Sequence, residues 1–336
     1  SAFFIGKITK IQQQLLQVIG EVKIDSEEYQ CNQKLEQFKY LSDEDIIRIV
    51  KKSATKSCIL DPIPTSLIKQ NLDILAPIIK DILNLSLQSG TVPECMKEAI
   101  VIPLHKKPTL DLTLKNFRPV SNLTYISKLV EKAVADQLVS YLNTHNLQEK
   151  FQSSYRSGHS TESALLRVKN DILLDMDKKK VVLLVLLDLS AAFDTVHHGI
   201  LLDRLRSIGV SGTALTWFES YLSLRKQCVM IGDTKSSPEI LTCGVPQGSV
   251  LGPILFTIYV KPLGDKIRLQ GIEFMFYADD EQLYLAAIPD QAFVEQCVEK
   301  VQNCAVSIKD WLTHNLLMFN DNKTEAMIMG TAVQKQ

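Results

Sequence analysis

The stretch Phe276-Tyr277-Ala278-Asp279-Asp280 places two adjacent carboxylates at the end of an apolar run that is typical of a β-strand. Residues 282–285 form another strand-like run, so the acidic pair is predicted at the tip of a β-hairpin. The most hydrophobic run of the chain, Val181–Leu187, ends in a third carboxylate, Asp188. Because neighbouring strands lie about 4.8 Å apart, pairing of these segments would bring the three acids together.

Three crowded carboxylates create an electrostatic conflict that metal ions resolve. Without a partner, such carboxylates repel each other and their pKa values rise. Oxygen-ligated Mg²⁺, with Mn²⁺ as a substitute, removes the conflict, and two such ions are the usual device for in-line phosphoryl chemistry. An Asp-Asp pair between strands is more often a solvated turn, and for Asp279 and Asp280 alone that interpretation is favoured. Asp188, at the end of a buried strand, favours a metal site instead.

Three segments resemble the palm of reverse transcriptases. Tyr277-Ala278-Asp279-Asp280 is similar to the Y-x-D-D box. Leu187-Asp188-Leu189-Ser190-Ala191-Ala192-Phe193-Asp194 is similar to the first catalytic motif as it occurs in non-LTR (LINE-type) retrotransposons. Gly244-Val245-Pro246-Gln247-Gly248-Ser249-Val250-Leu251-Gly252-Pro253 is similar to the next motif. The agreement extends over about residues 40–330, and the ordered set is far more specific than a single Y-x-D-D box.

The resemblance implies an α+β fold with the fingers and palm of a right-hand polymerase, in which an antiparallel catalytic sheet packs on helices. It also implies an RNA-directed DNA polymerase, a nucleotidyltransferase whose partners are an RNA template, a DNA primer and dNTPs. Asp188, Asp279 and Asp280 would then be the catalytic, metal-binding carboxylates of a two-metal transfer to the primer 3′-hydroxyl. The alternative is a truncated, inactive remnant that acts as a nucleic-acid-binding module, and a primer-extension assay separates the two.

By the same resemblance, eight further residues are expected to bind substrate. Arg118 donates bidentately to phosphate oxygens, Lys106 or Lys107 adds a point charge, and Lys323 lies near the leaving pyrophosphate. For each of these cations, a solvated turn or hairpin remains the alternative. The complete set is Lys106, Lys107, Arg118, Phe193, Gln247, Gly248, Tyr277 and Lys323.

Phe193 has the spacing from Asp188 of a steric gate against a ribose 2′-hydroxyl, although a core role is the alternative. The glycines of residues 244–252 allow close backbone approach to a base pair or sugar, with Gln247 in the position of the family glutamine. Residues 151–162 match a loop that lies against the template in the family. Glu281 stands where the family usually has a small hydroxyl residue, so a fourth acid is expected to add negative charge beside the aspartates.

Length and pattern divide the chain into segments. A chain of 336 residues with 46% hydrophobic content can form two or three lobes. Residues 1–40 are predicted to be an N-terminal helix and linker, with Ile8, Ile11, Leu15 and Val18 on one helical face. Residues 41–95 are predicted to be a helical extension, with a capping-box-like start at Ser42 and Asp45 and a helix over residues 67–89 that stops at Gly90. Residues 96–180 are expected to be the fingers, where the resemblance implies a basic hairpin, and residues 181–330 the palm, fingers and palm being interleaved. Residues 227–231 and 239–243 are predicted to form a strand pair, and the order of the elements predicts an antiparallel sheet with helices on one face. A thumb is expected to be absent or truncated.

Charge is unevenly distributed along the chain. The net charge is −1, yet residues 97–132 carry seven basic and three acidic residues, whereas residues 277–310 carry seven acidic residues and two lysines. This asymmetry favours a polymerase, although a solvated surface could also produce it. Seven scattered cysteines indicate neither a disulfide framework nor a zinc site. With no membrane-length apolar run and no stable protein partner evident, a soluble, intracellular protein of the cytoplasm or nucleus is expected.

A turn at residues 189–192 is predicted after Asp188, followed by a helix around residues 197–208. Asp194 is expected to be the N-cap of this helix. His197 and His198 are adjacent, so in a helix they would point about 100° apart and could not share a metal. They are therefore expected on the helix surface.

Overall fold

The computed structural model describes residues 2–20 and 32–330, which fall into two compact units. Unit 1 comprises Ser1–Lys10, Ile24–Leu147 and Phe193–Leu255, and unit 2 comprises Ile11–Lys23, Gln148–Ala192 and Phe256–Gln336. The linker predicted after the first helix falls largely outside the described residues. Among residues 2–20 and 32–330, no helix combines the length and the apolar character needed to cross a bilayer.

Unit 1 is largely helical, and its helices begin and end where local chemistry dictates. The capping box predicted at Ser42 and Asp45 is present. The helix predicted up to Gly90 does end there, with Gly90 in the left-handed region, but it is broken at Asn71. Trp217 is fully buried, and its Nε1 donates to Ser86 Oγ at 3.1 Å. The elements are α2 (Asp43–Lys52), α3 (Thr65–Gln70), α4 (Leu72–Ser89), η1 (Glu94–Met96), α5 (Tyr125–Thr144), α8 (His198–Ser207) and α9 (Gly212–Leu222), with α7 (Ala192–Thr195) at the boundary of the units.

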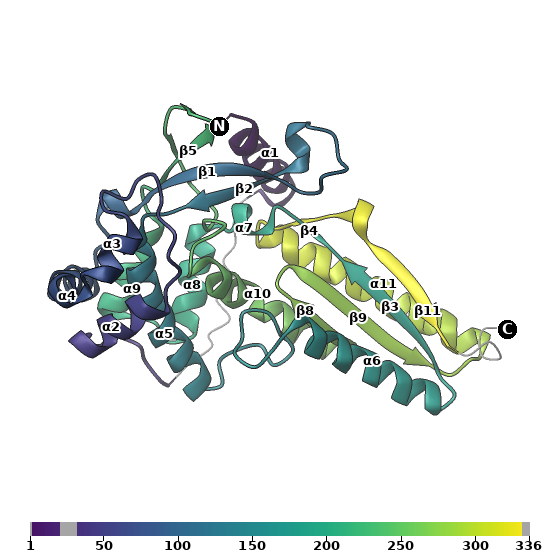
Figure 1. The fold of residues 1–336 in the computed structure, drawn as a ribbon. Helices are drawn as coiled ribbons and strands as arrows, with labels where there is room; N and C mark the ends of the chain where they lie inside the picture. The colour runs from purple at the N-terminus through teal and green to yellow at the C-terminus, as the bar shows by residue number, and fades with distance from the viewer. Residues whose placement is uncertain (1, 21–31, 331–336) are drawn as a thin grey trace. The chain divides into compact units, whose positions relative to one another are not determined.

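The sheet of unit 1 is built around the predicted basic hairpin (Figure 1). Strand β1 (Glu98–His105) pairs antiparallel with β2 (Phe117–Asn122) and parallel with β5 (Lys226–Ile231). The 3-10 turn η2 (Leu114–Asn116) leads into β2. On its other side β5 pairs antiparallel with β6 (Thr234–Lys235) and β7 (Glu239–Ile240), which confirms the strand pair predicted from residues 227–243.

Unit 2 contains the antiparallel sheet that the sequence predicts (Figure 1). In the described residues the strand order is β11-β3-β9-β8, with every neighbouring pair antiparallel. Strand β3 lies between two strands and is covered on both faces, which explains why all of its residues are apolar. A short ladder joins β4 (Leu189–Ser190) to β10 (Met318–Phe319). The sheet strands are β3 (Val181–Leu187), β8 (Glu273–Tyr277), β9 (Asp280–Ala287) and β11 (Glu325–Met329).

Helices cover both faces of this sheet. Helix α6 (Thr161–Asp177) packs through Val168 on a cluster that includes Leu184 and Tyr284. Glu281 lies in the same strand as Tyr284 but at odd spacing, so it projects to the other face. There it neighbours Cys304 of α11 (Gln291–His314), whose pKa burial and then the Glu281 charge raise to about 11. The expectation from residue patterns alone of helices on one face is therefore too narrow, whereas the α+β class is confirmed.

Two further helices complete unit 2 from segments distant in sequence. The unit 2 part of α10 (Gly252–Leu269) approaches β8, because a Cβ added at Gly264 would lie 3.1 Å from the Phe274 ring. Ile11 and Leu15 of α1 (Ala2–Ile19) pack with Leu316. Val18, predicted on the same buried face, is 75% exposed. The short turn η3 (Asp321–Lys323) precedes β11.

Candidate active site

The register of β3 and β9 brings two of the three predicted carboxylates together. Leu187 pairs with Glu281 at the end of the ladder, so the next residue of one strand, Asp188, meets the preceding residue of the other, Asp280. Partial burial of the Asp280 carboxyl group raises its pKa, and the Asp188 charge raises it further. The two carboxylates are therefore close enough to repel each other, as the sequence predicts.

Asp279 lies on the turn that joins β8 to β9. Tyr277 pairs with Asp280 across the hairpin, and Ala278 between them has φ +60°, in the left-handed region. The Asp279 charge contributes to the raised pKa of Tyr155, after burial. Across residues 2–20 and 32–330, no three His, Cys, Asp or Glu side chains are already grouped as a metal site. The predicted convergence therefore holds for Asp188 and Asp280, with Asp279 adjoining them along the chain.

Lys323 lies at the carboxylates, together with a residue that sequence reasoning missed, and its expected role at the leaving pyrophosphate stays a prediction. Asp188 Oδ2 accepts hydrogen bonds from Lys323 Nζ at 2.9 Å and from Asn320 Nδ2 at 2.7 Å. The backbone also joins here, since Asn320 N donates to Asp188 O at 3.0 Å. The Lys323 charge opposes the rise in the pKa of Asp280. Asn320 gives no signal in the sequence beyond its place in a polar turn after a strand-like run.

The donor set of this end of the sheet suits a hard divalent cation. Asp188 and Asp280 offer carboxylate oxygens, the ligands that Mg²⁺ and Mn²⁺ prefer. Their mutual repulsion, seen in the raised pKa of Asp280, is relieved by positive charge, which Lys323 supplies in this structure. The residues present therefore fit a divalent metal.

Glu281 does not add charge to the carboxylate site, so the expectation of a fourth active-site anion is wrong. Its side chain is 3% exposed, and its Oε2 atom has no hydrogen-bond partner among the described residues. Burial, then the Asp279 charge, raises the pKa of Glu281 to about 8. The physical reason is strand alternation: consecutive residues of β9 project to opposite faces, and Glu281 faces the helices. Burial and the Asp279 charge both favour its protonated form.

The segment expected against the template begins by pairing with the hairpin. Phe276 N donates to Phe151 O at 2.8 Å, and Ser153 N donates to Phe276 O at 3.0 Å. These bonds extend the sheet beyond β8 at the end that carries Tyr277. Gln152, which sequence reasoning did not single out, lies in this added segment.

The predicted phosphate-binding cations lie on the hairpin of unit 1. Arg118 is exposed on β2, opposite Leu104. Lys106 Nζ donates to Lys115 O at 2.8 Å, a bond that ties the hairpin end together. Lys107 is exposed in the turn that follows. The hairpin is as predicted, and the role of these cations stays a prediction.

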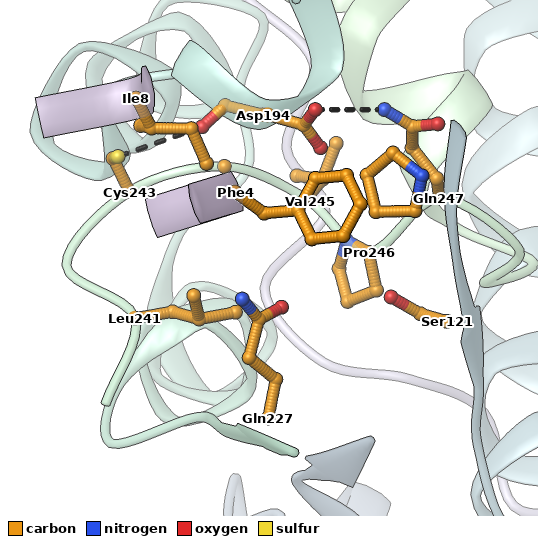
Figure 2. A pocket seen from close by; sticks show the side chains of 12 residues that line it. Phe4, Ile8, Ser121, Asp194, Gln227, Leu241, Cys243, Val245, Pro246 and Gln247 are labelled. Atoms are coloured by element: carbon orange, nitrogen blue, oxygen red, sulfur yellow. Dashed lines mark hydrogen bonds between the residues drawn. The ribbon is translucent and has the colours of Figure 1, made fainter. Parts of the chain in front are cut away.

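Gln247 and Gly248 lie in a loop of unit 1 that is fastened to β2. Ser121 N donates to Gln247 O at 2.7 Å, and Gly248 has φ +109° with no room for a side chain, because a Cβ would lie 2.6 Å from Ser121 O. Gln247 Nε2 donates to Asp194 Oδ2 at 2.9 Å beside a small pocket that Phe4 also lines (Figure 2). In this structure, the backbone that closely approaches Gly248 therefore belongs to Ser121 of the protein itself.

Asp194 and the two histidines take roles other than those expected. Asp194 lies within α7, and burial raises its pKa to about 6 while Gln247 opposes the shift. The N-cap of α8 is His197, whose ring accepts from Ile200 N. His198 Nε2 donates to Gly244 O at 2.9 Å, and burial lowers the pKa of both histidines. The cap and surface assignments are therefore wrong: Asp194 and His198 bind the segment of Gly244 and Gln247, and His197 caps α8 in place of Asp194.

Phe193, the predicted steric gate, is half-buried at the start of α7. Its carbonyl accepts a hydrogen bond from Val245 N at 2.9 Å. The preceding residues include Ala191 with φ +54°, a sharp turn like the one predicted between Asp188 and Phe193. The sugar-discriminating role stays a prediction.

Similar proteins point in the same direction as the carboxylate geometry. Residues 104–335 match the reverse transcriptase (RNA-dependent DNA polymerase) family. The chain is 27% identical to a probable RNA-directed DNA polymerase from transposon BS of Drosophila melanogaster, over 72% of this chain and 27% of that protein. It is 26% identical to the RNA-directed DNA polymerase from mobile element jockey of Drosophila funebris, over 75% of this chain and 28% of that protein.

A third relative and a solved structure extend the comparison. Identity reaches 33% with a probable RNA-directed DNA polymerase from transposon X-element of Drosophila melanogaster, over 50% of this chain and 18% of that protein. The fold resembles apo telomerase from Candida tropicalis truncated from its C-terminal domain, with TM-score 0.50 and 14% identity over 72% of this chain and 52% of that one. The chain thus spans about a quarter of the length of the first two relatives. Since the family match covers most of the chain and includes both the Asp188 and the Asp279-Asp280 motifs, the chain belongs to the reverse transcriptase family, in its non-LTR (LINE-type) branch.

Proposed function

We propose that the chain carries the polymerase activity of an RNA-directed DNA polymerase and adds dNTPs to a DNA primer on an RNA template. The observation that carries the proposal is the placement of Asp188 and Asp280 side by side at the end of an antiparallel sheet, with Lys323 bound to Asp188. An inactive remnant would be expected to lose such residues once selection on them ended. Asp188, Asp279 and Asp280 are all retained.

The carboxylates would hold Mg²⁺, with Mn²⁺ as a substitute. Bound there, the metal supplies Lewis acidity that favours the deprotonated primer hydroxyl and offsets phosphate charge. Asp188 and Asp280 contribute charge from the ends of neighbouring strands, and Asp279 contributes it from the turn. Asn320 orients Asp188 through its 2.7 Å hydrogen bond. Lys323 supplies a cation that can move from Asp188 to the departing pyrophosphate, because its side chain is 66% exposed.

Substrate recognition is proposed for residues in both units, each by its type and by its family position. Arg118, Lys106 and Lys107 would bind the triphosphate, and Tyr277 would contact the nucleotide beside the carboxylates. Phe193 would exclude the ribose 2′-hydroxyl. Gln247 and Gly248 would support the nucleotide and template through the loop that Ser121 fastens. In this proposal residues 96–180 are the fingers, residues 181–330 are the palm, and residues 41–95 precede them.

Primer extension tests the proposal directly. The chain is incubated with dNTPs, Mg²⁺ or Mn²⁺, and a labelled DNA primer on RNA or on DNA templates of the same sequence. Extension on RNA by the wild type, and its loss in Asp188→Asn, is the expected result. Asp175→Asn is the matched control, because it removes a carboxylate that pairs with Lys180 at 3.2 Å on the same unit. Extension by Asp188→Asn at the wild-type rate would overturn the assignment.

A further inference from the structure

Gln152 brackets the backbone of Ala278, the residue that precedes Asp279 in the hairpin turn. Its Oε1 accepts a hydrogen bond from Ala278 N at 3.1 Å, and its Nε2 donates to Ala278 O at 3.3 Å. The same Oε1 accepts from Ser154 N at 3.0 Å. Gln152 is 3% exposed, so these bonds form out of contact with solvent. One side chain therefore binds both backbone polar groups of a single turn residue.

The turn needs such support because Ala278 adopts an unfavourable conformation. Its φ of +60° lies in the left-handed region, where a residue with a Cβ loses roughly 1–2 kcal/mol relative to the right-handed one. The peptide groups of a turn residue lie outside the strand ladder and have to find other partners. Gln152 supplies both partners to Ala278 in the conformation of this structure. The two hydrogen bonds therefore favour this conformation of the turn over others, in which the Asp279 side chain would point in a different direction.

The segment that carries Gln152 is itself firmly anchored. Arg156 Nη1 donates to Gln152 O at 3.2 Å and to Glu149 O at 3.0 Å. Glu149 is buried, and both its carboxylate oxygens accept from Arg268 Nη2 of α10, at 3.0 and 2.9 Å. Together with the backbone bonds to Phe276, these contacts give Gln152 a fixed platform from which to hold the turn.

We propose that Gln152 is a positioning residue, which holds the turn from Tyr277 to Asp280 in the conformation that presents Asp279 and Asp280 at the end of the sheet. It acts through the backbone of Ala278. Its kinetic consequence rests on the polymerase function proposed above, whereas its conformational consequence does not. The two can therefore be tested apart.

Hydrogen exchange at the Ala278 amide tests the conformational part. Gln152→Met keeps much of the side-chain volume and removes both hydrogen bonds, so exchange at Ala278 should accelerate about tenfold, while amides of β3 stay protected. The matched control is Asn84→Ala, because Asn84 is also 3% exposed and brackets Leu41 in the same way, at 2.8 and 3.0 Å. It should leave Ala278 unchanged.

A second variant, Gln152→Asn, keeps the proposal testable if Gln152→Met does not fold. Gln152→Asn retains the amide but is one methylene shorter, so it cannot reach both groups of Ala278 and should give the same acceleration. Unchanged exchange at Ala278 in whichever variant folds, judged by β3 protection, overturns the proposal. Acceleration in Asn84→Ala as large as in the Gln152 variants also overturns it, because the effect would then reflect general loosening.

Kinetics test the consequence for catalysis. In Gln152→Met, kcat for nucleotide addition should fall about tenfold with KM for the dNTP unchanged. Adding Ala278→Gly should recover part of the loss, because glycine adopts positive φ at no steric cost. A purely structural role would lower the melting temperature, leave kcat in place and show no recovery. If the wild type extends no primer, the polymerase proposal fails while the exchange result still decides the role of Gln152.

Discussion

Lys323 Nζ lies 2.9 Å from Asp188 Oδ2, so in this structure the ammonium group lies beside a carboxylate that is proposed to bind metal. A cation arriving at Asp188 has to compete with the ammonium group. Since the Lys323 side chain is 66% exposed, the ion pair itself contributes little to stability, about 0–1 kcal/mol. The role proposed for Lys323 is therefore functional and not one of stabilising the fold.

Replacing Lys323 separates its competition with metal at Asp188 from its action on the leaving pyrophosphate. In Lys323→Gln we expect half-saturation at a lower Mg²⁺ concentration, because Asp188 loses its competitor, and a kcat lower by about tenfold or more, because the leaving pyrophosphate loses a cation. Primer extension across a Mg²⁺ titration measures both. Lys309→Gln is the control, since Lys309 pairs with Asp321 of the same turn at 2.9 Å. Equal effects of the two variants would count against a special role for Lys323.

Glu281 predicts an unusual dependence of stability on pH. Its pKa is raised to about 8 in the folded protein, against an ordinary value of 4.5. The folded state therefore holds the proton more tightly than the unfolded state between these values. The Glu281 contribution to the free energy of unfolding should fall by about 1.4 kcal/mol per pH unit from roughly pH 4.5 to pH 8 and then level off.

Urea unfolding of Glu281→Gln measures this contribution. The variant keeps the shape but cannot ionise, so its advantage over the wild type should grow as pH rises from 5 to 8. Glu273→Gln, at an exposed position of β8, should show no such trend. Parallel pH profiles for wild type and Glu281→Gln would mean that Glu281 ionises freely in the fold.

Phe193 gives a prediction about sugar selection. In Phe193→Ala the ratio of kcat/KM for dATP over ATP should fall, because the ring no longer fills the space of a 2′-hydroxyl. Phe193→Leu, which keeps part of the bulk, should give an intermediate ratio. Since Phe193 is half-buried, the stability loss should stay below the roughly 3 kcal/mol of a fully buried ring. A ratio that does not change along this series would make Phe193 a packing residue.

Loss of the Glu131 carboxylate is expected to destabilise unit 1 strongly. Its Oε2 accepts from Val250 N at 2.6 Å and Leu251 N at 3.1 Å, in the loop after Gln247, and the side chain is 1% exposed. Burial raises its pKa, and the charge of the buried Arg225 opposes this. Glu131→Ala would leave these groups unpaired and should cost about 3–5 kcal/mol.

Thermal or urea unfolding measures that cost. Asp136→Ala is the control on the same helix, because it breaks an exposed ion pair with Lys132 and should cost about 1 kcal/mol or less. If the two variants lose the same stability, Glu131 does not organise the loop.

Sequence patterns within a few residues predict many of the helices and strands of this protein. Contacts between segments that are distant in sequence determine the remaining features. The capping box at Ser42, the helix end at Gly90 and the antiparallel strands follow from signals within a few residues. Asp188 and Asp280 are predictable because each adjoins a recognisable strand-like run. Gln152, Asn320 and Glu131 were missed, because each side chain bonds a segment more than a hundred residues away in sequence, and nothing local marks that partner.

Two errors show why residue type is a weak guide to role. Glu281 was expected to be an active-site charge because it follows two aspartates, but strand alternation sends it to the buried face. Asp194 was expected to cap a helix, the common role of aspartate at such a position, yet it binds Gln247 instead. In both cases the protonation and the function of the acid depend on residues that surround it in space. These residues cannot be identified from the neighbouring sequence.

The register between β3 and β9 makes the length of the hairpin decide which acid lies at the proposed active site. Asp280 and Glu281 are chemically similar neighbours, and a shift of β9 by one residue against β3 would exchange them, burying the aspartate and exposing the glutamate. Leu187 and Leu283, 3% and 0% exposed, oppose such a shift because it would turn the apolar set of β9 toward the wrong face. Residue 278 should therefore accept substitution more readily than this turn accepts the insertion or deletion of a single residue.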